Sequence, residues 1–118
     1  MFAPTVVVEP PAEARLSREE VFGPVTCVYT YRDLDDAIAR ANALPLAFQA
    51  SVFTRDLGVA MRAASRLNAS AVMINDHTAF RTDWMPFAGR KQSGYGIGGI
   101  PYTLHDMLQA KMIVLNGV

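Results

Sequence analysis

The chain has 118 residues, 51% of them hydrophobic, which suits one packed domain rather than a disordered segment. Its 11 Lys and Arg residues balance 11 Asp and Glu residues, and its apolar runs are shorter than the roughly 20 residues of a membrane span, so we expect neither a nucleic-acid nor a membrane partner. The N-terminus lacks the pattern of a secretory signal and Cys27 is the single cysteine, so we expect a cytoplasmic protein.

Strand and helix signals alternate along the first part of the chain. β-branched residues predict strands over 4–8 and 25–31, and two prolines end the first of them because proline donates no ladder hydrogen bond. Asp33 resembles a helix N-cap, and the apolar residues after it recur at the spacing of one helical face. We therefore expect a helix from there to about Pro45.

The second part repeats this order and then changes character. We expect a strand over 50–54, a helix from the Asp56 cap to about Asn68, and a strand over 71–74. A polar, glycine-containing loop follows from Asn75 to about Pro101, then one or two helical turns over 103–109 and a last strand over 111–115.

These elements predict an α/β fold with a parallel β-α-β-α-β core between residues 25 and 74. Ligands in such sheets gather beyond the carboxyl ends of the strands, and a loop as long as the one that starts at Asn75 is usually functional. We therefore expect a site at the end of the 71–74 strand.

Several residues invite a catalytic or metal-binding interpretation that their context does not support. The glycine cluster 93–99 lies inside a loop, so it is no dinucleotide fingerprint, and Lys91 lacks the spacing of a phosphate-loop lysine. Cys27 lies in the middle of a strand, which favours a packing role. His77 and His105 have no partners at metal-ligand spacing. We expect neither a metal site nor a catalytic residue in this chain.

The loop over 75–87 combines an amide, a cation, a histidine and three aromatic residues. Apolar walls with a few polar groups are typical of small-molecule sites, and His77 is placed to contact a ligand there. The aromatic residues would equally serve to cover the edge of the sheet. The residues alone leave both interpretations open.

Four segments, in order, resemble the C-terminal portion of the NAD(P)-dependent aldehyde dehydrogenase superfamily. They are EEVFGPV at 19–25, VFTRDL at 52–57, VMIN at 72–75 and MPFAGRKQSGYG at 85–96. The chain departs from the family at Ala47 and Phe48, where Gly-Leu is usual, and at Ala88, where glycine is common. The resemblance implies part of the catalytic domain of such an enzyme, which oxidises an aldehyde to a carboxylic acid.

The resemblance also implies roles for particular residues. Glu20 would accept hydrogen bonds from the nicotinamide ribose of NAD or NADP, and Phe22 would pack near the nicotinamide. Phe87 would form a wall of the substrate tunnel, and a cation such as Arg81 would favour an aldehyde with an anionic tail. Alternatively, Arg81 pairs with Asp83 or Asp76. The candidate substrate residues are Phe87, Arg81, Phe80 and His77.

The same resemblance places the catalytic cysteine, the general-base glutamate, the oxyanion-hole asparagine and the dinucleotide-binding domain upstream of Met1. We therefore expect residues 1–118 to form one partial domain, inactive alone and without tight binding of NAD or NADP, with residues 103–118 as an assembly tail that includes a C-terminal assembly strand and supports a homo-oligomer. The alternative is a non-catalytic, self-associating folded module.

Overall fold

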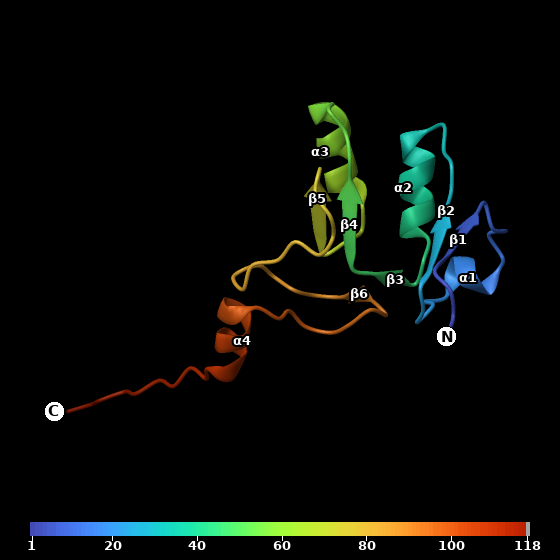
Figure 1. Cartoon of the computed structure of the whole chain (residues 1–118). Helices are drawn as coiled ribbons and strands as arrows, with labels where there is room; N and C mark the ends of the chain where they lie inside the picture. The colour runs from blue at the N-terminus through green and yellow to red at the C-terminus, as the bar shows by residue number, and fades with distance from the viewer. Residues whose placement is uncertain (118) are drawn as a thin grey trace.

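The computed structural model describes residues 1–117, which form four helices and six strands (Figure 1). In chain order the elements are β1 (Thr5–Val8), α1 (Arg15–Arg18), β2 (Val25–Val28), α2 (Leu34–Asn42), β3 (Leu46–Ala47), β4 (Gln49–Val52), α3 (Leu57–Arg66), β5 (Ala71–Ile74), β6 (Arg90–Lys91) and α4 (Ile100–Met107). The mixed α/β class predicted from the sequence is confirmed.

The six strands form three separate two-stranded sheets. β1 and β2 are parallel, with Thr5 opposite Val25 and Val8 opposite Val28, and β4 and β5 are parallel in the same manner. β3 pairs with β6 in the antiparallel sense. The expectation of one continuous core sheet is wrong within residues 1–117, because β2 and β4 are not paired. A right-handed crossover fixes the direction of the next strand but does not make it a neighbour, since doubly wound sheets often place strands out of sequence order.

Both long helices begin at the predicted caps. A side-chain oxygen of Asp33 accepts hydrogen bonds from the backbone N–H groups of Asp35 and Asp36 at 2.8 and 3.1 Å. Asp56 accepts one from Val59 N–H at 3.0 Å. Each aspartate thereby satisfies N–H groups that lack a partner within the helix. α3 packs on β4 and β5, and α2 packs chiefly against α3.

The helix α1 lies between the first two predicted strands, where the sequence predicts no helix or strand. It is a single turn without a side-chain N-cap. Outside the helical hydrogen bond, the Ser17 hydroxyl donates to Pro11 C=O at 2.8 Å, and Arg18 Nε donates to Ala12 C=O at 2.9 Å. These contacts fold the proline-containing segment back, and a four-residue turn of this kind leaves no periodic signal in the sequence.

The C-terminal part differs from its prediction in two respects. α4 begins three residues before the predicted 103, because Gly99 at φ 118° turns the chain in a conformation that favours glycine and Pro101 suits the first helical turn. The strand expected over 111–115 is not formed. Residues 108–117 run away from the body of the molecule without regular structure (Figure 1). A strand needs a neighbour for its backbone groups, and no segment within residues 1–117 supplies one.

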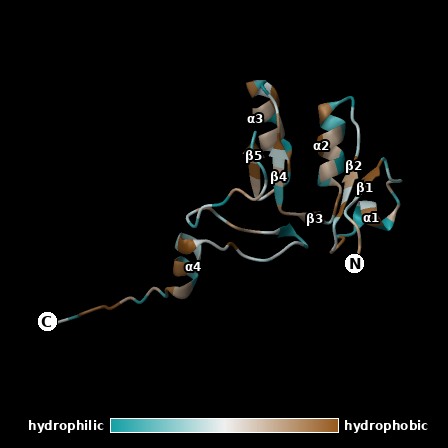
Figure 2. Ribbon diagram, in the orientation of Figure 1, coloured by the Kyte–Doolittle hydropathy of each residue, from teal (hydrophilic) through white to brown (hydrophobic). Residues whose placement is uncertain are grey.

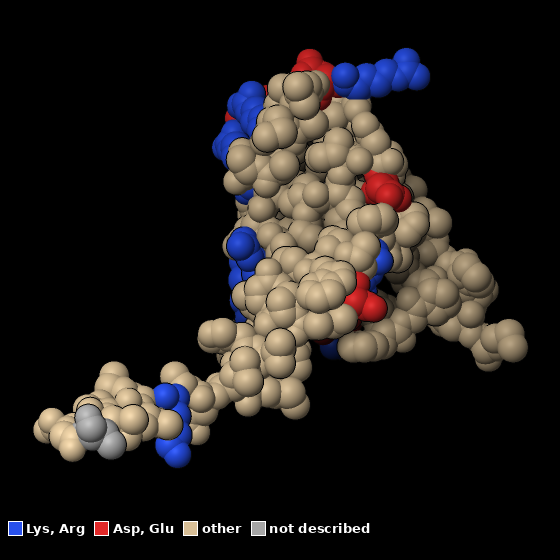
Figure 3. Space-filling model, turned by 90° about the vertical axis from the view of Figure 1, so that its left-hand side faces the viewer, with Lys and Arg blue, Asp and Glu red and all other residues tan. Residues whose placement is uncertain are grey.

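Few apolar side chains are buried. The hydrophobic core within residues 1–117 consists of Ile38, Ala60, Ala63 and Met73. The radius of gyration is 19.8 Å, whereas a compact domain of this size has about 13 Å. Figure 2 shows hydrophobic residues along α4 and the extended C-terminal segment, and the face in Figure 3 carries few charges. Exposed apolar surface of this extent is typical of a contact surface. No helix within residues 1–117 is long and apolar enough to cross a membrane.

Candidate functional site

The loop over 75–87 leaves the carboxyl end of β5 at a fixed point. The side chain of Asn75 bridges the backbone of Thr54: its Oδ1 accepts from Thr54 N–H at 2.8 Å and its Nδ2 donates to Thr54 C=O at 2.9 Å. Asn75 itself has φ 58°, a conformation that asparagine tolerates better than most residues. Asn75, the last residue of the VMIN segment, therefore anchors the start of the loop to the residues that follow β4.

His77 takes part in a turn directly after this anchor. Its Nδ1 accepts a hydrogen bond from Ala79 N–H at 3.1 Å, and its own N–H donates to Asp76 Oδ1 at 2.7 Å. The Asp76 carbonyl in turn accepts from the Ser51 hydroxyl at 2.7 Å. With Nδ1 used as an acceptor, the neutral imidazole carries its proton on Nε2. The hydrogen bonds of His77 are thus local, to its neighbours Asp76 and Ala79.

Arg81 and Phe87 are brought together. The Arg81 guanidinium lies over the Phe87 ring, 4.2 Å from its centroid, in a cation–π arrangement. The Phe87 ring also meets Phe48 edge to face, with centroids 5.0 Å apart. The alternative ion pair of Arg81 with Asp83 or Asp76 is not among the salt bridges of residues 1–117. The ring face holds the guanidinium from one side and leaves its N–H edges for other partners.

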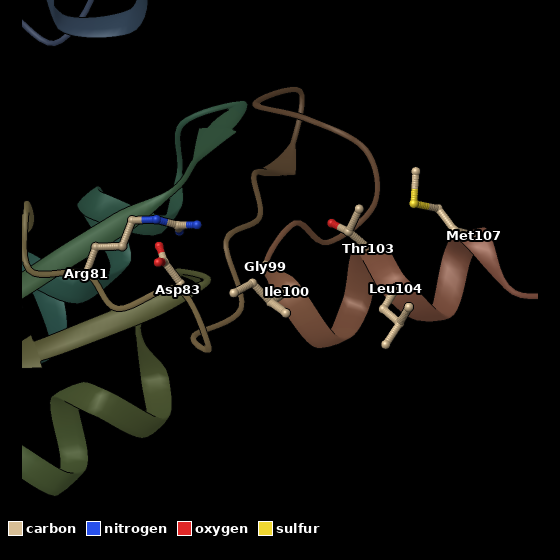
Figure 4. A pocket seen from close by; sticks show the side chains of 7 residues that line it. All are labelled: Arg81, Asp83, Gly99, Ile100, Thr103, Leu104 and Met107. Carbon is tan, nitrogen blue, oxygen red and sulfur yellow. The ribbon is translucent and has the colours of Figure 1, made fainter.

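An open cavity of about 450 Å³ lies between this loop and α4 (Figure 4). Arg81 and Asp83 border it on the loop side, and the rest of its lining is Gly99, Ile100, Thr103, Leu104 and Met107. Ile100, Leu104 and Met107 recur at the spacing of one helical face. The cavity therefore combines an apolar helix face with one cation and one carboxylate, which is the composition expected of a small-molecule site.

A larger cavity of about 870 Å³ lies between α1, the end of β2 and α2. None of the predicted site residues lines it, although Glu19, the neighbour of Glu20, does. Its volume alone does not make it the better candidate, because the predicted substrate cation lines the smaller cavity.

The two cofactor candidates follow α1. Arg15 holds Glu19 through hydrogen bonds of 2.7 to 3.1 Å, and this hydrogen bond lowers the pKa of the Glu19 carboxyl from its usual value. Within residues 1–117 the carboxylate of Glu20 makes no side-chain hydrogen bond or salt bridge, unlike that of Glu19. The Phe22 side chain is 94% exposed. Figure 1 shows the connection between α1 and β2, to which Glu20 and Phe22 belong, apart from the loop over 75–87.

Sequence reasoning missed part of this constellation. Phe48 was noted only as a departure from a family pattern, yet its ring supports the predicted wall residue Phe87. The apolar spacing of α4 was the available signal for the helix side of the cavity. Of the four candidate substrate residues only Arg81 lines the cavity, whereas Phe87, Phe80 and His77 do not. No group of three or more His, Cys, Asp or Glu residues that would suit a metal ion occurs in the described part of the chain.

The chain belongs to the aldehyde dehydrogenase family, because the model of that family matches residues 1–113. It is 36% identical over 115 residues to 3-sulfolactaldehyde dehydrogenase of Priestia aryabhattai, with 98% of this chain and 24% of that protein covered. Aldehyde dehydrogenase 21 of Physcomitrella patens, solved with the reaction product succinate, is 36% identical with a TM-score of 0.90 over 100% of this chain and 24% of its own.

A third relative adds a cofactor. A double mutant of betaine aldehyde dehydrogenase from Staphylococcus aureus, solved with NAD+, is 35% identical with a TM-score of 0.86 over 93% of this chain and 22% of its own. The chain thus spans about a quarter of the length of the relatives that it matches. The family resemblance predicted from the four sequence segments is confirmed.

Proposed function

We propose that residues 1–118 are the C-terminal part of the catalytic domain of an NAD(P)-dependent aldehyde dehydrogenase that oxidises an aldehyde to a carboxylic acid. The chain supplies one side of the substrate site and part of the cofactor site, while the nucleophile comes from elsewhere in the fold. The observation that carries this proposal is the Arg81–Phe87 stack beside the cavity between the loop over 75–87 and α4, in a chain of this family.

The cofactor part of the proposal depends on Glu20 and Phe22. A carboxylate without a protein partner is suited to accept hydrogen bonds from two ribose hydroxyls. Glu19 is already held by Arg15, so Glu20 is the carboxylate available for this role. The exposed ring of Phe22 offers an apolar face against which a nicotinamide could pack. When bound, the nicotinamide would accept the hydride from the substrate. The betaine aldehyde dehydrogenase relative was solved with NAD+, which agrees with NAD as the cofactor of the complete protein.

The substrate part of the proposal is an aldehyde with an anionic group. The guanidinium of Arg81 stacks on the Phe87 ring through its flat face. Within residues 1–117 its N–H groups are therefore available to make fork-like hydrogen bonds to a carboxylate or sulfonate. The names of two relatives agree with this chemistry, since 3-sulfolactaldehyde and succinate both carry anionic groups. Phe87 forms the wall that orients this cation. Phe80 and His77 remain candidates at the edge of the site.

The test is the substitution Arg81→Ala in the complete protein, with Arg55→Ala as the matched control at an exposed position outside the loop. A hydrogen bond to a charged group contributes about 1.5–3 kcal/mol, so we expect kcat/KM for an anionic aldehyde to fall about 10- to 150-fold in Arg81→Ala. The value for a neutral aldehyde of similar size should change little. Equal losses for both aldehydes would rule out the anionic-substrate assignment.

We further propose that the two parallel pairs belong to one sheet of the complete protein, with strands from outside these residues lying between β2 and β4. The chain superposes as a whole on aldehyde dehydrogenase 21 with a TM-score of 0.90, although β2 and β4 do not pair with each other. Residues 108–117 then act as the assembly tail of a homo-oligomer, pairing as a strand with another subunit. Their exposed apolar side chains support this role.

A self-associating, non-catalytic module is the second candidate, favoured by the same exposed apolar surface. An aldehyde-dependent absorbance assay of the complete protein, beside light scattering of the 118-residue chain, separates the two. Aldehyde oxidation by the complete protein supports the enzyme. Its absence, with self-association of the chain retained, supports the module.

A further inference from the structure

We propose that Lys91 is a positioning residue for the substrate side of the site. Hydrogen bonds from its ammonium group hold the turn over 89–93 against the C-terminal end of α2. These hydrogen bonds fix the position of Phe87 and therefore that of Arg81. The consequence for catalysis rests on the proposed function, whereas the consequence for the structure of the loop does not.

The contacts of Lys91 are specific. Its Nζ donates hydrogen bonds to the carbonyl oxygens of Asn42 and Leu44, both at 2.6 Å. Asn42 is the last residue of α2, where carbonyl groups lack helical partners and carry the negative end of the helix dipole. Lys91 itself has φ 53°, which residues other than glycine seldom adopt. Two charge-assisted hydrogen bonds offset the cost of that backbone conformation.

The β3–β6 pairing, which includes Lys91, is too short to fix its own register. β3 and β6 share only the pairs Leu46 with Lys91 and Ala47 with Arg90. So short a ladder specifies its register weakly unless other contacts support it. Around it, Ala47 N–H donates to the Ser93 hydroxyl at 3.0 Å, and the N–H of Gln92 donates to the carbonyl of Pro45 at 3.0 Å. The turn is also tightly closed, because a Cβ on Gly89 would lie 2.4 Å from the backbone of Ser93.

The C-terminal end of α2, to which Lys91 donates its hydrogen bonds, is itself hydrogen-bonded to the end of α3. The Asn42 side chain donates to Arg66 C=O at 2.8 Å and accepts from Asn68 N–H at 2.8 Å, so it joins the ends of α2 and α3. Arg90 donates to Asn68 Oδ1 at 2.9 Å, next to the contacts of Lys91. The turn over 89–93 is therefore tied to both helices of the packed part of the molecule.

The position of this turn affects the position of Phe87 through two sets of contacts. Phe48 directly follows β3, and its ring meets that of Phe87 at an interplanar angle of 88°. On the other side, Phe87 exchanges two backbone hydrogen bonds with Gly98, at 3.0 and 2.8 Å. A shift of β6 along β3 would separate the two rings and move the guanidinium of Arg81 that stacks on Phe87.

The test compares Lys91→Met with Arg55→Met in the complete protein. Both variants lose one positive charge, but Arg55 lies at an exposed position between β4 and α3, away from the turn over 89–93. Hydrogen exchange is followed by mass spectrometry in peptides that contain Ala47, Phe87 and Gly98, with α3 as the internal reference. We expect exchange at these three amides to be about tenfold faster in Lys91→Met, unchanged in α3, and unchanged at these amides and in α3 in Arg55→Met.

Lys91→Arg is the second variant, since a guanidinium can donate to the same two carbonyl oxygens and should restore slow exchange. Equal exchange in Lys91→Met and the unchanged protein would overturn the proposal. So would loss of protection throughout α3, which would make Lys91 a support of the whole fold, or failure of Lys91→Arg to restore protection. Absence of protection at the three amides in the unchanged protein would overturn it as well.

A kinetic measurement then links the anchor to the proposed function. In Lys91→Met we expect the KM for the aldehyde to rise about tenfold while the KM for NAD or NADP stays the same, because only the substrate side moves. If the complete protein oxidises no aldehyde, the proposed function fails and the exchange result still decides the role of Lys91. If the enzyme is active and exchange is unchanged, only the anchor fails.

Discussion

The unit of α3, β4 and β5 and the unit of α4 with its C-terminal segment are both rich in apolar residues, yet they differ in burial. The first contains Ala60, Ala63 and Met73, three of the four core residues, whereas Ile113 in the second is 74% exposed. Apolar periodicity predicts that a segment forms a helix or strand, but most of its stability comes from the surface against which it packs. The first unit has that surface within the chain and the second has not.

The largest expected effect separates two isoleucines. Ile38 in α2 is 5% exposed and Ile113 is 74% exposed, so Ile38→Ala should lower the free energy of unfolding by about 2–4 kcal/mol, whereas Ile113→Ala should change it by less than about 0.5 kcal/mol. Urea denaturation at a concentration where the chain is monomeric measures both values. Similar losses in the two variants would mean that the C-terminal segment packs on the chain in solution.

A smaller effect concerns association through the second unit. Burying one isoleucine side chain contributes about 1.5–3 kcal/mol, so Ile113→Asp should weaken self-association of the chain about tenfold or more. Asn116→Asp adds the same charge to the same segment at a polar residue and is the control. Light scattering across a concentration series gives the association constant. A wild-type chain that stays monomeric at high concentration would contradict the proposed assembly role.

The smallest effect lies inside the packed unit and depends on pH. Asp35 pairs with Arg66 and Arg62, and these hydrogen bonds lower the pKa of its carboxyl below the ordinary 3.8. A lowered folded-state pKa stabilises the protein above the ordinary value, and that stability is lost as the pH falls through the lowered pKa. The midpoint temperature of thermal unfolding should therefore fall by a small amount as the pH is lowered below about 3.8.

Two aspartate variants test that pH dependence. Asp35→Asn should be less stable than the unchanged chain near neutral pH. Its unfolding temperature should also fall less steeply at acid pH (the acid limb of the stability curve), because the amide cannot titrate. Asp106→Asn, at an exposed position in α4, is the control and should leave the limb unchanged. Identical acid limbs for Asp35→Asn and the unchanged chain would show that the pairs between α2 and α3 contribute nothing measurable.

The elements that the sequence predicts well are those whose signals are local. The caps at Asp33 and Asp56 and the β-branched strands lie where their residues indicate. The errors are non-local: β3 and β6 are two residues each, and their pairing depends on Lys91 and Ser93, which are distant from Ala47 in sequence. The strand expected over 111–115 had the right composition but no neighbour among residues 1–117.

The candidate site was predictable to a similar degree. The composition of the loop after Asn75 and the family resemblance pointed to Arg81 and Phe87, and the structure brings these two together. No sequence pattern indicated that Phe48 would meet Phe87, because ring contacts between distant segments have no periodicity. The roles of Glu20 and Phe22 remain predictions.

The stack of Phe48, Phe87 and Arg81 also bears on how this site can change by mutation. The ring of Phe87 contacts both other side chains, so the effect of replacing one member depends on which residues occupy the other two positions. Coupled positions of this kind are non-additive. Selection for a new aldehyde would therefore reach its best combinations by sampling the three codons jointly, and a scan of single substitutions would undervalue each of them.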